Sequence, residues 1–140
     1  MQPWILYAIL AALFASCTAI FAKAGLKNVD SDIATAIRTS LILMITWGMV
    51  IIKGKVTQVQ ILNKHNWIFL TLSAIATGAS WLYYYKALQI GDVAKVSAID
   101  KGSIVFTVVL SFIFLKEALT PQLLLGTALV LIGVLVIIWK

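Results

Sequence analysis

Residues 93–115 carry two charged side chains inside an apolar stretch that is long enough to cross a lipid bilayer. At about 1.5 Å per residue, a helix of this length spans the roughly 30 Å of bilayer hydrocarbon. Asp100 and Lys101 lie well inside it, and a charge deep in a membrane helix costs about 2.5–3.5 kcal/mol on insertion scales. We therefore expect both side chains to face the interior of a helix bundle.

One face of this predicted helix is polar along nearly its whole length. Successive residues are about 100° apart around a helix, so side chains that share an arc of about 120° can be read from the spacing. The polar residues in that arc are Ser97, Asp100, Ser103, Thr107 and Ser111. Valine, phenylalanine, leucine and isoleucine occupy the opposite side, which suits contact with lipid or with another helix. The pattern predicts a polar pathway along this helix.

The composition indicates an integral membrane protein. Hydrophobic residues make up 62% of the 140 residues and charged residues 11%, and the mean hydropathy is +1.04. A soluble domain carries about 25% charged residues, so an aqueous globule is excluded. The net charge of +6 fits lysines at helix ends, where they set topology and contact lipid headgroups, and we expect no nucleic acid to bind.

Nothing in the sequence points to an enzyme. It lacks the glycine-rich motifs that bind nucleotides and dinucleotides and the paired histidines of zinc proteases. A single cysteine and a single histidine leave no ligand set for a metal cluster. We expect no catalytic residue, no cofactor and no metal.

The predicted fold is an all-α membrane protein, a bundle of five transmembrane helices that forms one domain over residues 1–140. The apolar stretches are residues 4–22, 33–52, 67–85, 93–115 and 122–139. Helices are favoured over a barrel because the stretches are about 20 residues long and lack an alternating pattern. Thr120 followed by Pro121 predicts an N-cap and a first helical residue before the last helix.

Two other predicted helices also carry polar stripes. In residues 33–52 the stripe is Thr35, Arg38, Thr39 and Thr46, and in residues 67–85 it is Ser73, Thr77, Ser80 and Tyr84. The stripes fit a pocket, but serine and threonine also bond to their own backbone and let helices approach closely. Trp81 and Tyr84 fit either a pocket or the interfacial aromatic belt. In the last helix, Gly126 and Gly133 share a face for packing within the fold or across a dimer.

The embedded charges predict an ion pair and an anion site. Arg38 and Asp100 lie at similar depths, about 8–11 Å from the same side, so we expect them to pair. Asp100 and Lys101 point about 100° apart and are not expected to pair with each other. The three charges sum to +1, which favours a carboxylate, phosphate or zwitterion as the ligand. The alternative is a buried pair that only sets helix register.

Residues 87–138 resemble an EamA-type repeat of the drug/metabolite transporter superfamily. The matching features are Ala87-Leu88 before Gly91, Val96-Ser97, Phe114-Leu115 before Glu117, Thr120 at the turn, and Gly126 with Gly133. The five-helix plan extends the likeness over the chain, which is similar to the single-repeat, five-span subgroup of bacteria and archaea. The chain departs from many two-repeat members at Asp100-Lys101 and at Ile104, where those members have an apolar pair and then a proline. It also lacks the first-helix glutamate of small multidrug resistance proteins.

The resemblance implies a secondary transporter in the cell membrane of a bacterium or archaeon. We expect a small polar metabolite, anionic or zwitterionic, to cross by alternating access through a homodimer, whose copies could be antiparallel. The expected substrate-binding residues are Arg38, Asp100, Lys101, Ser97, Ser103, Ser80 and Tyr84. The alternative function is a non-transporting membrane subunit that scaffolds or regulates a partner.

Overall fold

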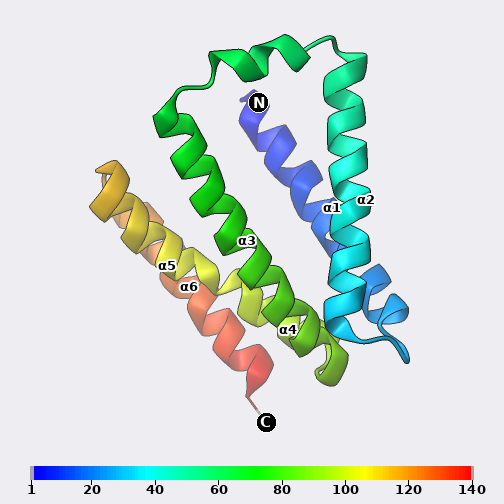
Figure 1. Ribbon diagram of the computed structural model, residues 1–140. Coiled ribbons are helices and arrows are strands. Elements are labelled where there is room, and N and C mark those ends of the chain that lie inside the picture. Colours follow the sequence, from blue (N-terminus) through cyan, green and yellow to red (C-terminus); the bar gives the residue numbers. More distant parts are fainter. Residues whose placement is uncertain (1, 140) are drawn as a thin grey trace. The chain divides into compact units, whose positions relative to one another are not determined.

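The computed structural model describes residues 2–139, which form α-helices with one 3₁₀ and one π-helical segment and no strand (Figure 1). The elements in chain order are α1 (Pro3–Gly25), α2 (Ser31–Ile52), η1 (Val56–Ile61), α3 (Lys64–Ile90), α4 (Val93–Lys101), α5 (Ser103–Leu110), η2 (Ser111–Leu115) and α6 (Pro121–Ile138). The prediction of an all-α protein is confirmed.

The predicted count of five spans is not confirmed. Four helical stretches are long and apolar enough to cross a membrane: Pro3–Gly25, Ser31–Ile52, Val93–Leu115 and Pro121–Ile138. The remaining helix, α3, has 27 residues, so its length would suffice. Its serine, threonine, tryptophan and tyrosine residues lower its hydropathy, which is the physical reason that it differs from the other four.

Side-chain caps define where two of the helices begin. The Thr120 hydroxyl oxygen accepts a hydrogen bond from the backbone N–H of Leu123 at 3.2 Å, with Pro121 at the first helical position, so the predicted N-cap is confirmed. Asp30 does the same for α2, because its Oδ1 accepts from the N–H groups of Asp32 and Ile33. Such caps satisfy amide groups that the first turn of a helix leaves unpaired.

The predicted continuous helix over residues 93–115 is interrupted. α4 ends at Lys101 and α5 begins at Ser103, with a tight turn at Gly102 whose N–H lies 2.9 Å from the carbonyl oxygen of Ile99. A Cβ atom at position 102 would lie 2.9 Å from that same oxygen, so only glycine fits this geometry. The break comes directly after Asp100 and Lys101, so the embedded charges lie at the end of a half-helix.

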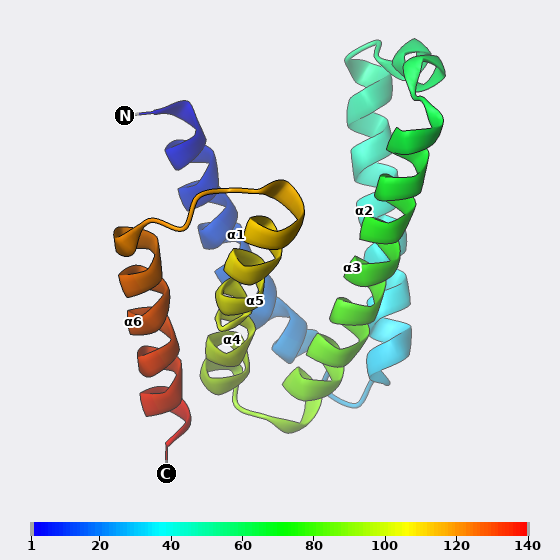
Figure 2. The same ribbon diagram turned by 90° about the vertical axis from the view of Figure 1, so that its left-hand side faces the viewer.

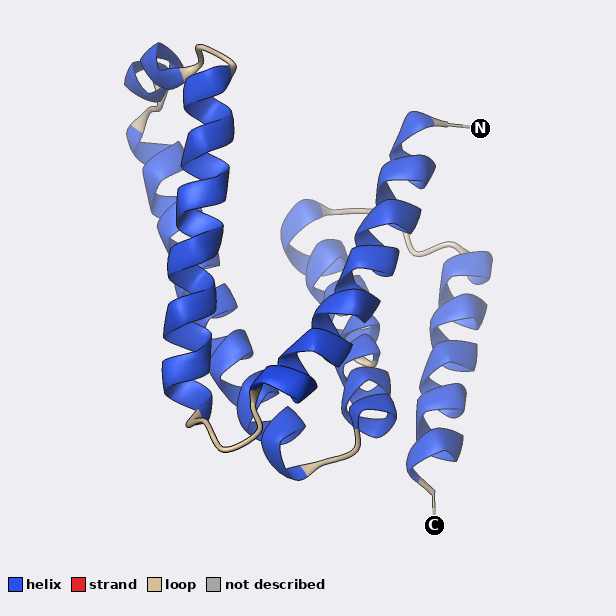
Figure 3. Cartoon of the chain, turned by 90° about the vertical axis from the view of Figure 1, so that its right-hand side faces the viewer, coloured by secondary structure: helices blue, strands red, loops and turns tan. Residues whose placement is uncertain are grey.

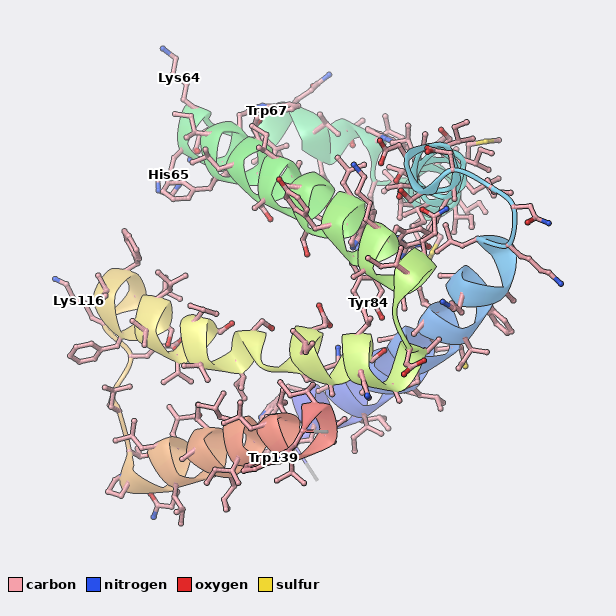
Figure 4. All side chains as sticks on the ribbon, turned by 90° about the horizontal axis from the view of Figure 1, so that it is seen from below. Lys64, His65, Trp67, Tyr84, Lys116 and Trp139 are labelled. Atoms are coloured by element: carbon pink, nitrogen blue, oxygen red, sulfur yellow. The ribbon has the colours of Figure 1, made fainter. Side chains whose placement is uncertain are left out.

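The chain divides into two compact units, and each is described by itself. The α2–α3 unit covers residues 21–89 and contains the last turn of α1, α2, η1 and most of α3. The α4–α6 unit contains α4, α5, η2 and α6 together with the first part of α1. Figure 4 shows side chains projecting from all sides of the helices, and most large apolar side chains are exposed, as expected for helices that contact lipid.

In the α2–α3 unit, α2 and α3 run antiparallel and approach each other where α2 begins and α3 ends (Figure 1). The buried side chains of the unit gather at this end: Ala22, Leu26, Ser31, Thr35, Tyr85 and Leu88. In the α4–α6 unit, α6 packs along α4 and α5 (Figures 2 and 3), and Val108, Thr127 and Val134 are buried.

Candidate functional site

A cavity of about 760 Å³ lies between α2 and α3. Volumes of this size are typical of pockets that bind small molecules. The lining residues from α2 are Asp32, Thr35, Ala36, Thr39, Ser40, Ile42, Leu43 and Thr46, and those from α3 are Leu70, Ser73, Ala74, Thr77, Gly78, Trp81 and Leu82. Five of the eight residues of the two polar stripes therefore line one cavity, although most of its wall is apolar.

The hydroxyl groups on the α2 wall donate to their own helix. Thr35, Thr39, Ser40 and Thr46 each donate to the carbonyl oxygen four residues earlier, at 2.7, 2.7, 3.0 and 2.9 Å respectively. Backbone bonding of this kind was the simpler interpretation of the stripe, and it is confirmed for these donors. Each hydroxyl oxygen still has lone pairs that can accept a hydrogen bond from a ligand.

The α3 wall combines two hydroxyl groups with an aromatic ring. Ser73, Thr77 and Trp81 follow one another at intervals of four residues, so they share one face of the helix. Trp81 is partly buried. This wall offers small polar groups at one end and a flat apolar surface at the other, which suits a ligand with both kinds of surface.

Arg38 is held by two aromatic rings beside the cavity. The centre of its guanidinium group lies 4.3 Å from the ring centroid of Trp81 and 5.4 Å from that of Tyr85. Tyr85 is only 4% exposed, so its ring is buried beside the guanidinium group. The Nη1 atom of Arg38 is buried, and no described residue accepts a hydrogen bond from it. Cation–π contact orients the group but supplies no hydrogen-bond acceptor.

The only carboxylate that lines the cavity in the described chain already has a cationic partner. Asp32 lies 3.6 Å from the ammonium of Lys86, measured from Oδ1 to Nζ. This pair brings the first turn of α2 and the last turns of α3 together. The positive charge of Arg38 is therefore not neutralised by Asp32.

The expectation that Asp100 and Lys101 do not pair is wrong. The Lys101 ammonium donates a hydrogen bond of 2.9 Å to Oδ2 of Asp100. The lysine stem is long and flexible enough to reach around the helix, so the angle between the two Cα–Cβ bonds does not prevent contact. The charges of Arg38, Asp100 and Lys101 still sum to +1. Of the two cations, Arg38 is the one that has no ion-pair partner among the described residues of its own unit.

The seven predicted site residues fall in both units, and none lines the cavity. Arg38, Ser80 and Tyr84 lie in the α2–α3 unit, with Ser80 exposed and Tyr84 half-buried. Ser97, Asp100, Lys101 and Ser103 lie in the α4–α6 unit. The predicted pairing of Arg38 with Asp100 joins the two units and stays a prediction.

The seven expected substrate-binding residues leave out those that line the cavity. Thr35, Thr39, Thr46, Ser73 and Thr77 were recognised as stripe members, but a single serine or threonine is a weak signal. The best available signal was that two stripes lie on neighbouring helices joined by a short connection. Such helices pack side by side, so their polar faces can meet.

Comparison with known proteins settles the family. Residues 2–139 match the EamA-like transporter family. The chain belongs to this family. A protein of Sinorhizobium sp., described as an uncharacterized transporter in the cobO 3′ region, is 42% identical to this EamA-like chain over 136 residues. The aligned region covers 97% of this chain and 96% of that protein. No solved structure matches the chain.

The family assignment confirms the resemblance seen in the sequence. The EamA-like chain is a multi-pass membrane protein of the drug/metabolite transporter kind, and the match covers one EamA-type domain. The α2–α3 cavity is thus a candidate site of this transporter-family chain whose lining residues all belong to one described unit.

Proposed function

We propose that this EamA-like chain is a secondary transporter of small metabolites that carry an anionic or zwitterionic group. The observation that carries the proposal is a cavity lined by members of two polar stripes, beside an arginine whose buried Nη1 atom has no acceptor among the described residues, in a chain of a transporter family. Small-molecule sites in helical transporters are built in this way, from a few polar groups in a largely apolar wall.

Transport proceeds by alternating access in a homodimer. One EamA-type domain supplies half of the two-repeat arrangement found in many transporters, and a second copy supplies the other half. Ser97, Asp100, Lys101 and Ser103 line or gate the pathway from the α4–α6 unit, while Arg38, Ser80 and Tyr84 contribute from the α2–α3 unit. Protons or the gradient of the solute itself drive the process, since the sequence carries no nucleotide-binding motif.

The cell membrane of a bacterium is the proposed location. The bacterial relative and the four apolar helices support it. In such a membrane the lysines at helix ends contact anionic headgroups.

Flux measurements on the purified chain test the proposal. Proteoliposomes that contain only this chain are challenged with carboxylates, phosphate esters and amino acids, and uptake is compared with that of protein-free liposomes. We expect saturable flux for at least one of these classes. Absence of flux for all of them would favour the alternative function, a membrane subunit that scaffolds a partner.

Lys101 offers a second test of the same proposal. We expect Lys101→Met to fold and to keep its oligomeric state but to lose flux, because the Asp100 carboxylate is then left without its partner at the gate. Lys116→Met is the matched control, because Lys116 is exposed and directly follows η2. Full flux by the Lys101 variant would show that the ammonium group of Lys101 has no role in the transport pathway.

A further inference from the structure

We infer that the α2–α3 cavity is a binding site for an organic anion with an apolar body, and that Arg38 binds its carboxylate or phosphate. This inference rests on the proposed function and narrows its substrate class. It also assigns the site to residues of a single unit, with Trp81 shared between the cavity wall and the arginine.

The position of Arg38 places a positive charge next to the cavity. Arg38 lies about 40° around α2 from Ile42, which lines the cavity, because residues four apart are offset by that angle. Its guanidinium group stacks on the ring of Trp81, which also lines the cavity. Arg38 is not itself a lining residue, so its charge lies behind Trp81 at the border of the cavity, and an anion reaches it past that ring.

The guanidinium group of Arg38 has a buried N–H donor that lacks an acceptor among the described residues, and an anionic ligand can supply one. A buried donor without an acceptor costs free energy, and more so when it is charged. Nη1 of Arg38 is such a donor. A carboxylate or phosphate satisfies a guanidinium group with two parallel hydrogen bonds. Stacking on Trp81 and Tyr85 holds the plane of the group in one orientation before the ligand arrives, which lowers the entropy cost of binding.

The cavity wall determines the rest of the ligand. Apolar side chains and the ring of Trp81 form most of it, so an apolar body gains free energy by leaving water. A zwitterion fits less well than an anion. Its ammonium would need Asp32, and that carboxylate is already paired with Lys86. The ligand class is therefore an amphipathic organic anion.

Binding to the purified full chain in phosphatidylcholine nanodiscs tests the ligand class. The probes are 3-phenylpropanoate, hexanoate and octanoate, the uncharged 3-phenylpropanamide, the cationic 3-phenylpropylammonium, and acetate, which has the charge but almost no apolar body. Calorimetric titrations are corrected with empty nanodiscs. We expect the amide, the ammonium compound and acetate to bind at least about tenfold more weakly than the best carboxylate. Equal binding of the amide, or no binding of the three larger carboxylates at millimolar concentration, overturns the inference.

Variants locate the bound anion. Arg38→Gln should weaken carboxylate binding at least about tenfold, and Arg38→Lys should give an intermediate affinity because it keeps the charge and loses the planar fork. Lys64→Gln removes one positive charge from the exposed first residue of α3, whose side chain points away from the ribbon in Figure 4, and should bind like the unchanged protein.

Thermal unfolding separates binding from a structural role. The melting temperature without ligand shows that Arg38→Gln is folded, and it is read together with the carboxylate affinity, because the change removes an unsatisfied donor and also two cation–π contacts. A lower melting temperature with unchanged carboxylate affinity would show that the arginine only supports the fold.

Two further measurements separate this inference from its rivals. Adding phosphatidylglycerol to the nanodiscs should leave carboxylate affinity unchanged, whereas displacement of the probe would show that an anionic lipid occupies the site. Flux separates the inference from the proposed function. If carboxylate binding depends on Arg38 but no flux is measured, the binding site is supported and the proposed transport function is contradicted. If flux is measured and Arg38→Gln does not change it, transport is supported and the binding role of Arg38 is contradicted.

Discussion

The ammonium of Lys23 donates a hydrogen bond of 2.6 Å to the carbonyl oxygen of Leu88 and lies 3.4 Å from that of Gln89. The last carbonyl groups of a helix have no intrahelical partner, and a cation there also complements the helix dipole. The Gln89 side chain donates in turn to the carbonyl oxygen of Val29 at 3.0 Å. The last turn of α1 and the start of α2 are thus fastened to the end of α3.

Lys23→Met should lower the free energy of unfolding by about 1.5–3 kcal/mol, because it leaves the carbonyl group of the buried Leu88 without its charged donor. Lys23→Arg should keep most of the stability. Lys27→Met is the control, since Lys27 lies four residues on and is exposed. Unfolding in mixed micelles monitored by circular dichroism measures the difference. Equal losses for Lys23→Met and Lys27→Met would show that the bond to Leu88 carries no stability.

Asp100 should couple to Lys101. In a double-mutant cycle, Asp100→Asn and Lys101→Met should together cost less than the sum of the single changes, with a coupling of about 0.5–3 kcal/mol, because each single change leaves one embedded charge without a partner. A second cycle with Arg38→Ala and Asp100→Ala tests the pair predicted from the sequence. Strict additivity in that second cycle would show that Arg38 and Asp100 do not meet.

Gly102→Ala should destabilise the chain by about 1–3 kcal/mol, because the new methyl group would lie 2.9 Å from the backbone oxygen of Ile99. Gly48→Ala is the matched control, since a Cβ there meets no atom within 4 Å. The same micellar unfolding assay applies. Were Gly102→Ala as stable as the control, the segment would simply straighten into one helix, and the break between α4 and α5 would not be a required feature.

The glycines of α6 should serve a contact between copies of the chain. A Cβ at Gly126 or Gly133 would meet no atom within 4 Å, so this face is not closely packed inside the described chain. Gly133→Leu should therefore leave the monomer folded and weaken the dimer by about tenfold or more. Light scattering in detergent measures the association, with Leu124→Ala, an exposed position on the opposite face of α6, as control. An unchanged dimer would place the interface elsewhere.

Both membrane orientations should occur. With five spans, one face carries Lys53, Lys55, Lys64 and Lys116, and the other carries Lys23, Lys27, Lys86, Lys95 and Lys140, the last of which lies outside the described residues. So small a difference sets orientation weakly under the positive-inside rule. Reporter fusions at the C-terminus should report both locations, and an added lysine should shift the ratio. A single location that added lysines do not move would indicate a fixed, parallel dimer.

Local sequence was sufficient for the membrane class, the all-helical fold and the start of α6. Long apolar runs can satisfy their backbone groups in lipid only as helices, so composition and length decide this much. The N-cap at Thr120, followed by Pro121, could also be predicted from the sequence, because a cap depends only on the residues of one helical turn. The polar stripes of α2 and α3 could also be read from spacing alone, and so could the family resemblance.

Tertiary structure decided which stripes share a cavity and which charge lacks a partner. Periodicity gives the direction of a Cα–Cβ bond, but a lysine side chain bends far from that direction, and so Asp100 pairs with Lys101. Likewise, no local rule places Arg38 over the ring of Trp81, 43 residues along the chain. The stacking depends on how closely two helices approach, and that distance is set by the packing of all their side chains at once.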